Sequence, residues 1–207
     1  RLSEQFNAWT YGVIAWAIGL GTLLLMTRST RLESASVFRP TMNQRGIWFG
    51  LSALGVALLM GISDAIVSDL AVTPIFWVVP LGLYLLSFIF CFGRINWATP
   101  RLWSPLFGLG ILLVVYLTLH GWRLAWFVQL TGWSVVLFVG CMVCHGELVR
   151  RRPPVEGLTV FYLYLAAGGV FGGLLCSVIA PQVLPLRAEI HLVMPLVTWV
   201  AWRSWRR

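Results

Sequence analysis

Seven apolar segments, each about as long as a helix that crosses a lipid bilayer, make up most of this chain. A spanning helix needs roughly 20 apolar residues, with a range of about 17–25. Charged residues are 11% of the 207 positions, whereas soluble domains carry about 25%. A surface so poor in charge is stable in contact with lipid hydrocarbon and not in contact with water. Hydrocarbon is spanned only by elements that satisfy all their backbone hydrogen bonds internally, such as helices. The chain is therefore predicted to be an all-α, polytopic transmembrane helical bundle. The predicted spans are residues 8–27, 46–63, 74–93, 102–119, 124–146, 158–180 and 188–202.

The arginines predict how these spans are oriented. All 15 basic residues are arginines, and they lie almost wholly between the apolar segments. If the connections alternate between the two sides of a membrane, twelve arginines fall on one side and three on the other. The side richer in Arg and Lys is the cytoplasmic one. We therefore expect seven spans in a bacterial cytoplasmic (inner) membrane, with the N-terminus outside and the C-terminus in the cytoplasm. The net charge of +8 reflects this topology, and no nucleic-acid partner is predicted.

The polar connections are short, so residues 1–207 are predicted to form a single transmembrane domain. Asp64–Thr73 is interpreted as a tight polar hairpin between the second and third spans. The last span is short and contains Pro195. No signal peptide is predicted, because the first apolar run is too long and no small-residue cleavage site follows it.

A CxxCH pattern, typical of covalent haem attachment, occurs at Cys141-Met-Val-Cys144-His145. It lies at the end of the fifth span on the arginine-rich side, whereas haem c is attached on the opposite face of the membrane. Its neighbours are apolar and helical, and buried thiols of this kind behave as small hydrophobes. Haem at Cys141, Cys144 and His145 is therefore not predicted, and no other cofactor is.

His145 and Glu147 are candidate functional residues, because ionisable groups at membrane depth are costly and usually serve a function. The structural alternative places them at the end of a helix, where Glu147 pairs with one of the arginines that follow it.

A second group of polar residues is predicted on the outer face. Asp64 and Asp69, with His120, Glu189 and His191, contain the oxygen and nitrogen donors of a metal or cation site. Glu189 and His191 are two positions apart, however, which directs them to different sides of a helix. No metal site is predicted, and Asp69 is interpreted as a helix cap or a lock on the hairpin.

The sequence Gly168-Gly169-Val-Phe-Gly172-Gly173 does not fit a phosphate-binding loop, since no strand precedes it and no Lys-Ser/Thr follows. Its glycines instead form two small-xxx-small pairs, Gly168 with Gly172 and Gly169 with Gly173. Such pairs let a neighbouring helix approach the backbone closely. This segment is predicted to be a helix-packing face.

Three stretches together resemble one family. They are Asp69-Leu-Ala-Val-Thr-Pro74-Ile-Phe-Trp77-Val-Val-Pro80-Leu-Gly-Leu-Tyr84, Cys144-His145-Gly146-Glu147-Leu148, and the glycine-rich segment. The chain resembles the membrane region of the fused spermidine-synthase-like bacterial membrane proteins, which are aminopropyltransferase-like and major-facilitator-like. The resemblance implies a polytopic region to which a soluble aminopropyltransferase-like domain is normally joined. That domain's glycine loop and acidic catalytic residues have no counterpart among these 207 residues, so aminopropyl transfer is not carried over.

The first functional hypothesis is a non-enzymatic accessory or scaffold module that docks to other membrane proteins. One alternative is a transporter or channel domain for a small solute, with Asp69, Glu147, Glu189 and the three histidines as its candidate binding groups. Others are the membrane half of an enzyme, and a pigment-, haem- or quinone-associated subunit of an electron-transfer complex with His145 or His191 as axial ligand. No catalytic residue is assigned to this chain.

Overall fold

The computed structural model describes residues 39–69, 75–93, 99–183 and 188–206, together with seven residues between positions 11 and 22. The chain divides into two compact units, Arg1–Val37 and Phe38–Arg207. In the first unit the described residues are all helical, and most of the predicted span 8–27 lies outside the described part. The described residues of the first unit are Tyr11, Ile14, Ala15, Ile18, Gly19, Gly21 and Thr22.

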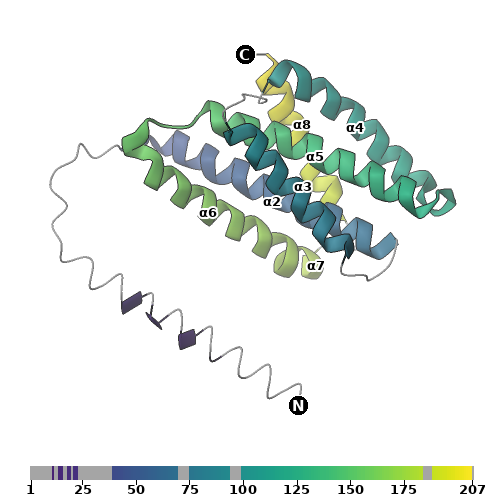
Figure 1. The fold of residues 1–207 in the computed structure, drawn as a ribbon, viewed down its shortest axis with the longest axis horizontal. Helices are drawn as coiled ribbons and strands as arrows, with labels where there is room; N and C mark the ends of the chain where they lie inside the picture. The colour runs from purple at the N-terminus through teal and green to yellow at the C-terminus, as the bar shows by residue number, and fades with distance from the viewer. Residues whose placement is uncertain are drawn as a thin grey trace. The chain divides into compact units, whose positions relative to one another are not determined.

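In the residues that the structure describes, helices are the only regular elements of the second unit, and short turns and extended segments connect them (Figure 1). The predicted all-α fold is therefore confirmed for this part of the chain, and each predicted span from 46–63 onward contains a helix. The helices are α2 (Met42–Asp69), α3 (Ile75–Phe92), α4 (Pro100–His120), α5 (Trp126–Arg150), α6 (Leu158–Leu174), α7 (Ala180–Val183) and α8 (Ala188–Trp205).

Four helical stretches in the described residues are long and apolar enough to cross a membrane. They are Met42–Ser68, Pro100–His120, Trp126–Arg150 and Val155–Gln182. Phe76–Phe92 is a shorter apolar helix. The chain is thus a membrane protein by the length and composition of its helices, and the count of seven spans stays a prediction.

Helix α2 begins earlier and ends later than its predicted span. At its start the Thr41 N–H donates to Gln44 Oε1 at 3.0 Å, and the Gln44 N–H donates to Thr41 Oγ1 at 3.3 Å. This reciprocal capping box satisfies two backbone donors that a helix start leaves free. At its other end the hairpin predicted from Asp64 is wrong, because the helix continues to Asp69. The helix continues past Asp64 because this carboxylate faces outward, while the inner face of the helix goes on with Ile66, which is completely buried.

The predicted span 158–180 is one helical stretch interrupted by a π-helical turn, Leu175–Ile179. Within it the Ala180 N–H donates to the Leu175 carbonyl. The next residue, Pro181, has no N–H, and its ring crowds the carbonyl four residues earlier. A widened turn removes that conflict, and π turns of this kind occur as single insertions in α-helices.

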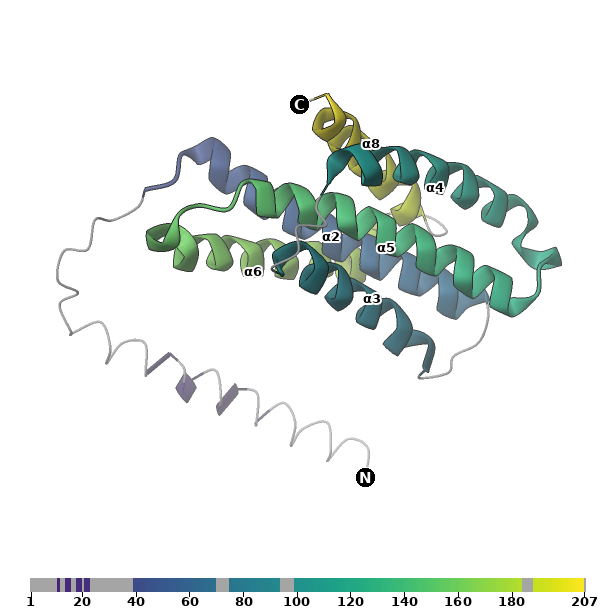
Figure 2. The ribbon, with the colours of Figure 1, turned by 45° about the horizontal axis from the view of Figure 1, so that its top comes forward.

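Helices α2 and α5 form the centre of the second unit. In the most apolar stretch of each, 61% of the residues are buried, compared with 22% in α4. Helix α2 lies between α5 and α6, whereas α3 and α4 pack on α5 (Figure 2). Helix α8 contacts α2, α4 and α5. The main core contains Leu58, Ile62 and Phe107 with Val136 and Leu137, all at most 2% exposed.

With α6 and α7 taken as one helical stretch, successive helices alternate in direction, so one end of the second unit contains the start of α2 and the ends of α5 and α8. Trp48 near the start of α2 contacts Arg151 at the end of α5, and Ser204 near the end of α8 contacts Glu147. We call this the arginine end. Among the described residues of this unit, the opposite end carries a single arginine, Arg123, which follows α4. The described arginines at the arginine end are Arg39, Arg45, Arg101, Arg150, Arg151, Arg152, Arg203 and Arg206.

Candidate functional site

The Glu147 carboxylate is the centre of a charged network at the arginine end. Arg150 Nη1 donates to Glu147 Oε2 at 3.1 Å, and Arg151 Nε donates to Glu147 Oε1 at 2.9 Å. These arginines follow at positions i+3 and i+4, which lie on the same face of a helix. The structural alternative for Glu147, an ion pair with a following arginine, is what the structure contains. Glu147 is only 5% exposed, so its charge is compensated by two guanidinium groups rather than by water.

The same network joins three helices. Ser204 Oγ of α8 donates to Glu147 Oε2 at 3.1 Å and accepts from Arg150 Nη1 at 3.2 Å. Trp48 Nε1 of α2 donates to the Arg151 carbonyl at 3.0 Å. The end of α5 is therefore fixed to both α2 and α8 by hydrogen bonds in which most partners are partly shielded from water.

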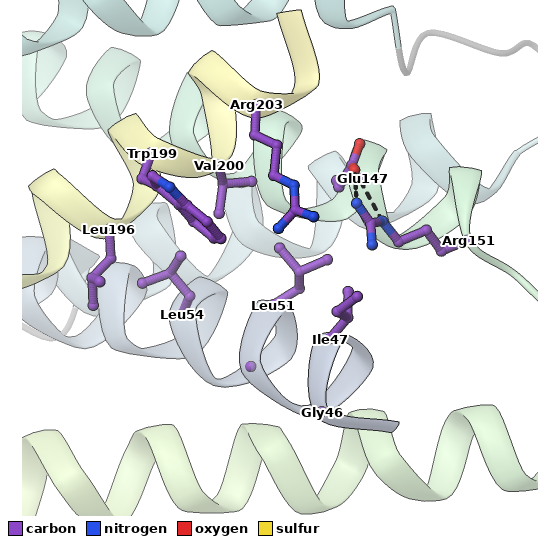
Figure 3. A pocket seen from close by; sticks show the side chains of 11 residues that line it. Gly46, Ile47, Leu51, Leu54, Glu147, Arg151, Leu196, Trp199, Val200 and Arg203 are labelled. Carbon is purple, nitrogen blue, oxygen red and sulfur yellow. Dashed lines mark hydrogen bonds and ion pairs between the residues drawn. The ribbon is translucent and has the colours of Figure 1, made fainter. Parts of the chain in front are cut away.

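A pocket of about 320 Å³ lies beside this network, between α2, α5 and α8 (Figure 3). The charged residues of the pocket lie together at one end, and its other end is apolar. Figure 3 shows Arg203, Glu147 and Arg151 on one side of the pocket. Leu54 and Leu196 lie on the other side. The lining comes from α2 (Gly46, Ile47, Gly50, Leu51, Leu54), from the end of α5 (Glu147, Arg151) and from α8 (Leu196, Trp199, Val200, Arg203).

Arg203 is the residue that gives this pocket its excess positive charge. Its guanidinium carbon lies 5.2 Å from the centre of the Trp199 ring, one helical turn earlier, at a distance that allows a cation–π interaction. Figure 3 shows its guanidinium directed into the pocket toward α2. Among the described residues no carboxylate pairs with it, whereas Arg151 is paired with Glu147. In the described part of the chain, the pocket therefore presents the guanidinium group of Arg203, without a paired carboxylate, above an apolar wall.

His145 faces away from this network, toward α2 and α3. It is completely buried, and its ring packs against Tyr84 and Phe88 with centroids 5.0 and 4.0 Å away. Ser87 Oγ donates to the Tyr84 carbonyl at 2.7 Å and lies 2.8 Å from His145 Nδ1. Because a hydroxyl has one proton, His145 Nδ1 is the donor in the second bond. His145 Nε2 then carries no proton, and its lone pair has no hydrogen-bond partner among the described residues.

The two cysteines of the CxxCH pattern are completely buried free thiols inside the continuous helix α5. Cys141 and Cys144 both lie in a stretch of α5 in which every residue from Val139 to Leu148 is buried. This arrangement is typical of thiols that pack as small hydrophobes.

The remaining candidate polar residues do not join this site. Asp69 is the last residue of α2, and Glu189 and His191 lie in the first turn of α8; their side chains are outside the described part of the structure. Glu189 is fifteen positions before Ser204, roughly 22 Å along a helix at 1.5 Å per residue. The outer group and the Glu147 network are thus at opposite ends of the unit, as the alternating topology leads us to expect.

The glycine segment packs within this chain. A Cβ on Gly168 would lie 2.3 Å from the Phe49 carbonyl oxygen, and one on Gly172 equally close to that of Ala53. These two glycines let α6 lie directly on the α2 backbone. Gly169 and Gly173 have ordinary contacts at 3.5 Å or more. The face with the tightest contacts is therefore already occupied by α2.

Several residues of the site had no signal that sequence reasoning could use. The spacing from Glu147 to its arginines is visible in the sequence, whereas Ser87, Trp199, Arg203 and Ser204 join the site only through the packing of α3 and α8 on α5. Comparison of the chain with known proteins found no matching family model, curated protein or solved structure.

Proposed function

We propose that this chain is a non-enzymatic membrane module that docks to other membrane proteins as an accessory or scaffold subunit. In this proposal it crosses a bacterial cytoplasmic membrane seven times, with its N-terminus outside and its arginine end in the cytoplasm. The collection of described arginines at one end of the second unit supports that orientation, since the cytoplasmic side is the one enriched in Arg and Lys.

The observation that carries the docking proposal is a groove of about 780 Å³ between α4 and α8. Its walls include Ile111, Val115 and Leu119 of α4 and Pro195, Trp199 and Trp202 of α8. Thr118 and Thr198 also line it, but their hydroxyls donate to the Val114 and Met194 carbonyls of their own helices at 2.8 and 2.7 Å. The groove is therefore apolar along its length.

An apolar groove of this kind suits a transmembrane helix of a partner. Association of helices in a bilayer depends on close van der Waals packing rather than on exclusion of water. A groove walled by two helices and two tryptophan rings offers more packing area than the convex surface of a single helix. The glycine face is not the docking surface in this proposal, because α2 covers Gly168 and Gly172.

The resemblance to the fused spermidine-synthase-like membrane proteins fits the same proposal. In that family the membrane region is joined to a soluble aminopropyltransferase-like domain, and a cytoplasmic arginine end would hold such a domain on the side of the membrane where its substrates are. The module would then serve to anchor and position catalytic machinery that other sequence provides.

The experiment is native mass spectrometry of the protein extracted gently from its own membrane. We expect the polypeptide in a stoichiometric assembly with a second membrane protein, and we expect Val115→Trp, which fills the groove, to release it. Leu85→Trp is the matched control, because Leu85 is about as exposed as Val115 but lies on α3 outside the groove. An assembly that survives Val115→Trp as well as Leu85→Trp contradicts docking at this groove. A polypeptide much heavier than 23.2 kDa with a soluble domain would identify a fused synthase-like protein.

A further inference from the structure

The pocket between α2, α5 and α8 has a charge distribution that points to an anionic ligand. Its charged end contains the Glu147 carboxylate and the guanidinium groups of Arg151 and Arg203. Glu147 is bound to Arg150 as well as to Arg151, so it does not neutralise Arg203. A ligand placed at Arg203 would meet a net positive field from three guanidinium groups and one carboxylate.

The rest of the pocket is suited to hydrocarbon. From Gly46 to Leu54 it follows nine residues of α2, a distance of about 12 Å along the helix, leading from the arginine end toward the middle of the helix. Leu51 and Leu54 line this stretch from α2, and Leu196 and Trp199 line it from α8. A small, fully hydrated anion gains nothing from these residues, whereas an acyl chain does.

Two glycines keep the pocket open. Gly46 and Gly50 are exposed on the face of α2 that lines it, and a Cβ added at either would meet no atom within 4 Å. Packing inside the protein does not require glycine at these positions, unlike Gly168 and Gly172. A side chain there would fill the pocket without disturbing the helix contacts.

We propose that this pocket binds an anionic phospholipid, with its phosphate at Arg203 and Arg151 and the start of an acyl chain against Leu54 and Leu196. Basic pockets between transmembrane helices on the cytoplasmic side are suited to anionic headgroups, and a volume of about 320 Å³ is within the usual range of ligand pockets and far too small for a helix. The site is distinct from the groove between α4 and α8, although Trp199 lines both. The inference does not rest on the docking proposal.

The test measures lipid retained by the purified full chain after reconstitution in nanodiscs containing equimolar phosphatidylglycerol and phosphatidylcholine. After transfer to mild detergent, native mass spectrometry counts the bound lipids. One arginine near an anionic surface contributes about 1 kcal/mol, or about fivefold in affinity. We expect the chain to prefer phosphatidylglycerol at least fivefold, and Arg203→Gln to reduce that preference about fivefold.

Two matched controls separate the pocket from general effects. Arg206→Gln removes the same charge from the same helix end, but Arg206 lies over the Trp202 ring and does not line the pocket. Gly50→Leu fills the pocket, whereas Gly82→Leu adds the same side chain on α3, also with no atom within 4 Å. We expect Arg206→Gln and Gly82→Leu to retain phosphatidylglycerol like the parent chain, and Gly50→Leu to lose it.

Three results would overturn the proposal. The first is equal retention of the two lipids by the parent chain. The second is an equal loss in Arg203→Gln and Arg206→Gln, or in Gly50→Leu and Gly82→Leu. The third is displacement of phosphatidylglycerol by glycerol phosphate, which has the same headgroup chemistry without acyl chains and would identify a site for a soluble phosphate instead.

Discussion

His145 Nδ1 lies 2.8 Å from Ser87 Oγ, and this bond joins α3 to α5 inside a pack of aromatic rings. Both side chains are completely buried, and Ser87 passes the connection on to the Tyr84 carbonyl. The pair is therefore a polar contact in a region otherwise stabilised by apolar packing. Removing the Ser87 hydroxyl alone would leave the buried His145 Nδ1–H donor without an acceptor.

We expect Ser87→Ala to lower the free energy of unfolding by about 1–3 kcal/mol, because a buried polar group that loses its partner retains its full desolvation penalty. Denaturant titration in detergent micelles measures this. Ser177→Ala is the control, since Ser177 is exposed and bonds only to the Gly173 carbonyl of its own helix. The double variant Ser87→Ala/His145→Leu should recover part of the loss, and equal effects of Ser87→Ala and Ser177→Ala would contradict the role given to this bond.

Glu147→Gln should destabilise the chain by about 1–3 kcal/mol, because it removes the charge shared by Arg150 and Arg151 and weakens the bond to Ser204 on α8. Glu156→Gln provides the comparison, since Glu156 is exposed outside this network. The measurement is the unfolding midpoint at fixed detergent concentration. A midpoint for Glu147→Gln that matches Glu156→Gln would mean that the network contributes nothing to stability.

The glycines of α6 give a second matched pair. Gly172→Ala places a Cβ 2.3 Å from the Ala53 carbonyl oxygen, so α6 must move away from α2, and we expect a loss of about 1–3 kcal/mol. Gly173→Ala meets nothing closer than 3.8 Å and should gain up to about 1 kcal/mol from helix propensity. Unfolding free energies of the two variants decide the matter, and a tolerated Gly172→Ala would show that the two helices are not in direct backbone contact.

The thiols offer a test that needs no substitution. Cys91, Cys141, Cys144 and Cys176 are all buried, so a membrane-impermeant maleimide should leave them unmodified in the folded chain and modify all of them after denaturation. Intact-mass measurement follows the reaction. Rapid modification of Cys141 or Cys144 in the folded chain would show that the CxxCH segment is accessible and would revive the haem hypothesis.

The length of the apolar segments was sufficient to predict the described helices, because a bilayer-length run of Leu, Val and Phe has few other stable forms. The ends of the helices were harder. Asp64 looked like the start of a hairpin, but a single outward-facing carboxylate does not end a helix whose inner face continues with Ile66. Glu147 and its arginines could be paired from spacing alone. Arg203 could not be assigned to the same pocket, because its position relative to Glu147 depends on how α8 packs against α5.

The π turn in front of Pro181 has a further consequence for the pairing of α2 with α6. Residues 168, 172 and 176 meet residues 49, 53 and 57 in turn, with Cys176 Sγ at 3.9 Å from the Ala57 carbonyl oxygen. A spacing of four residues drifts about 40° per step around an α-helix of 3.6 residues per turn, so a long seam of this spacing would rotate out of contact. The widened turn at Leu175–Ile179 rotates the following residues by less than an α-helical turn would. The face of α6 that meets α2 is thereby restored, and Ala180 is buried.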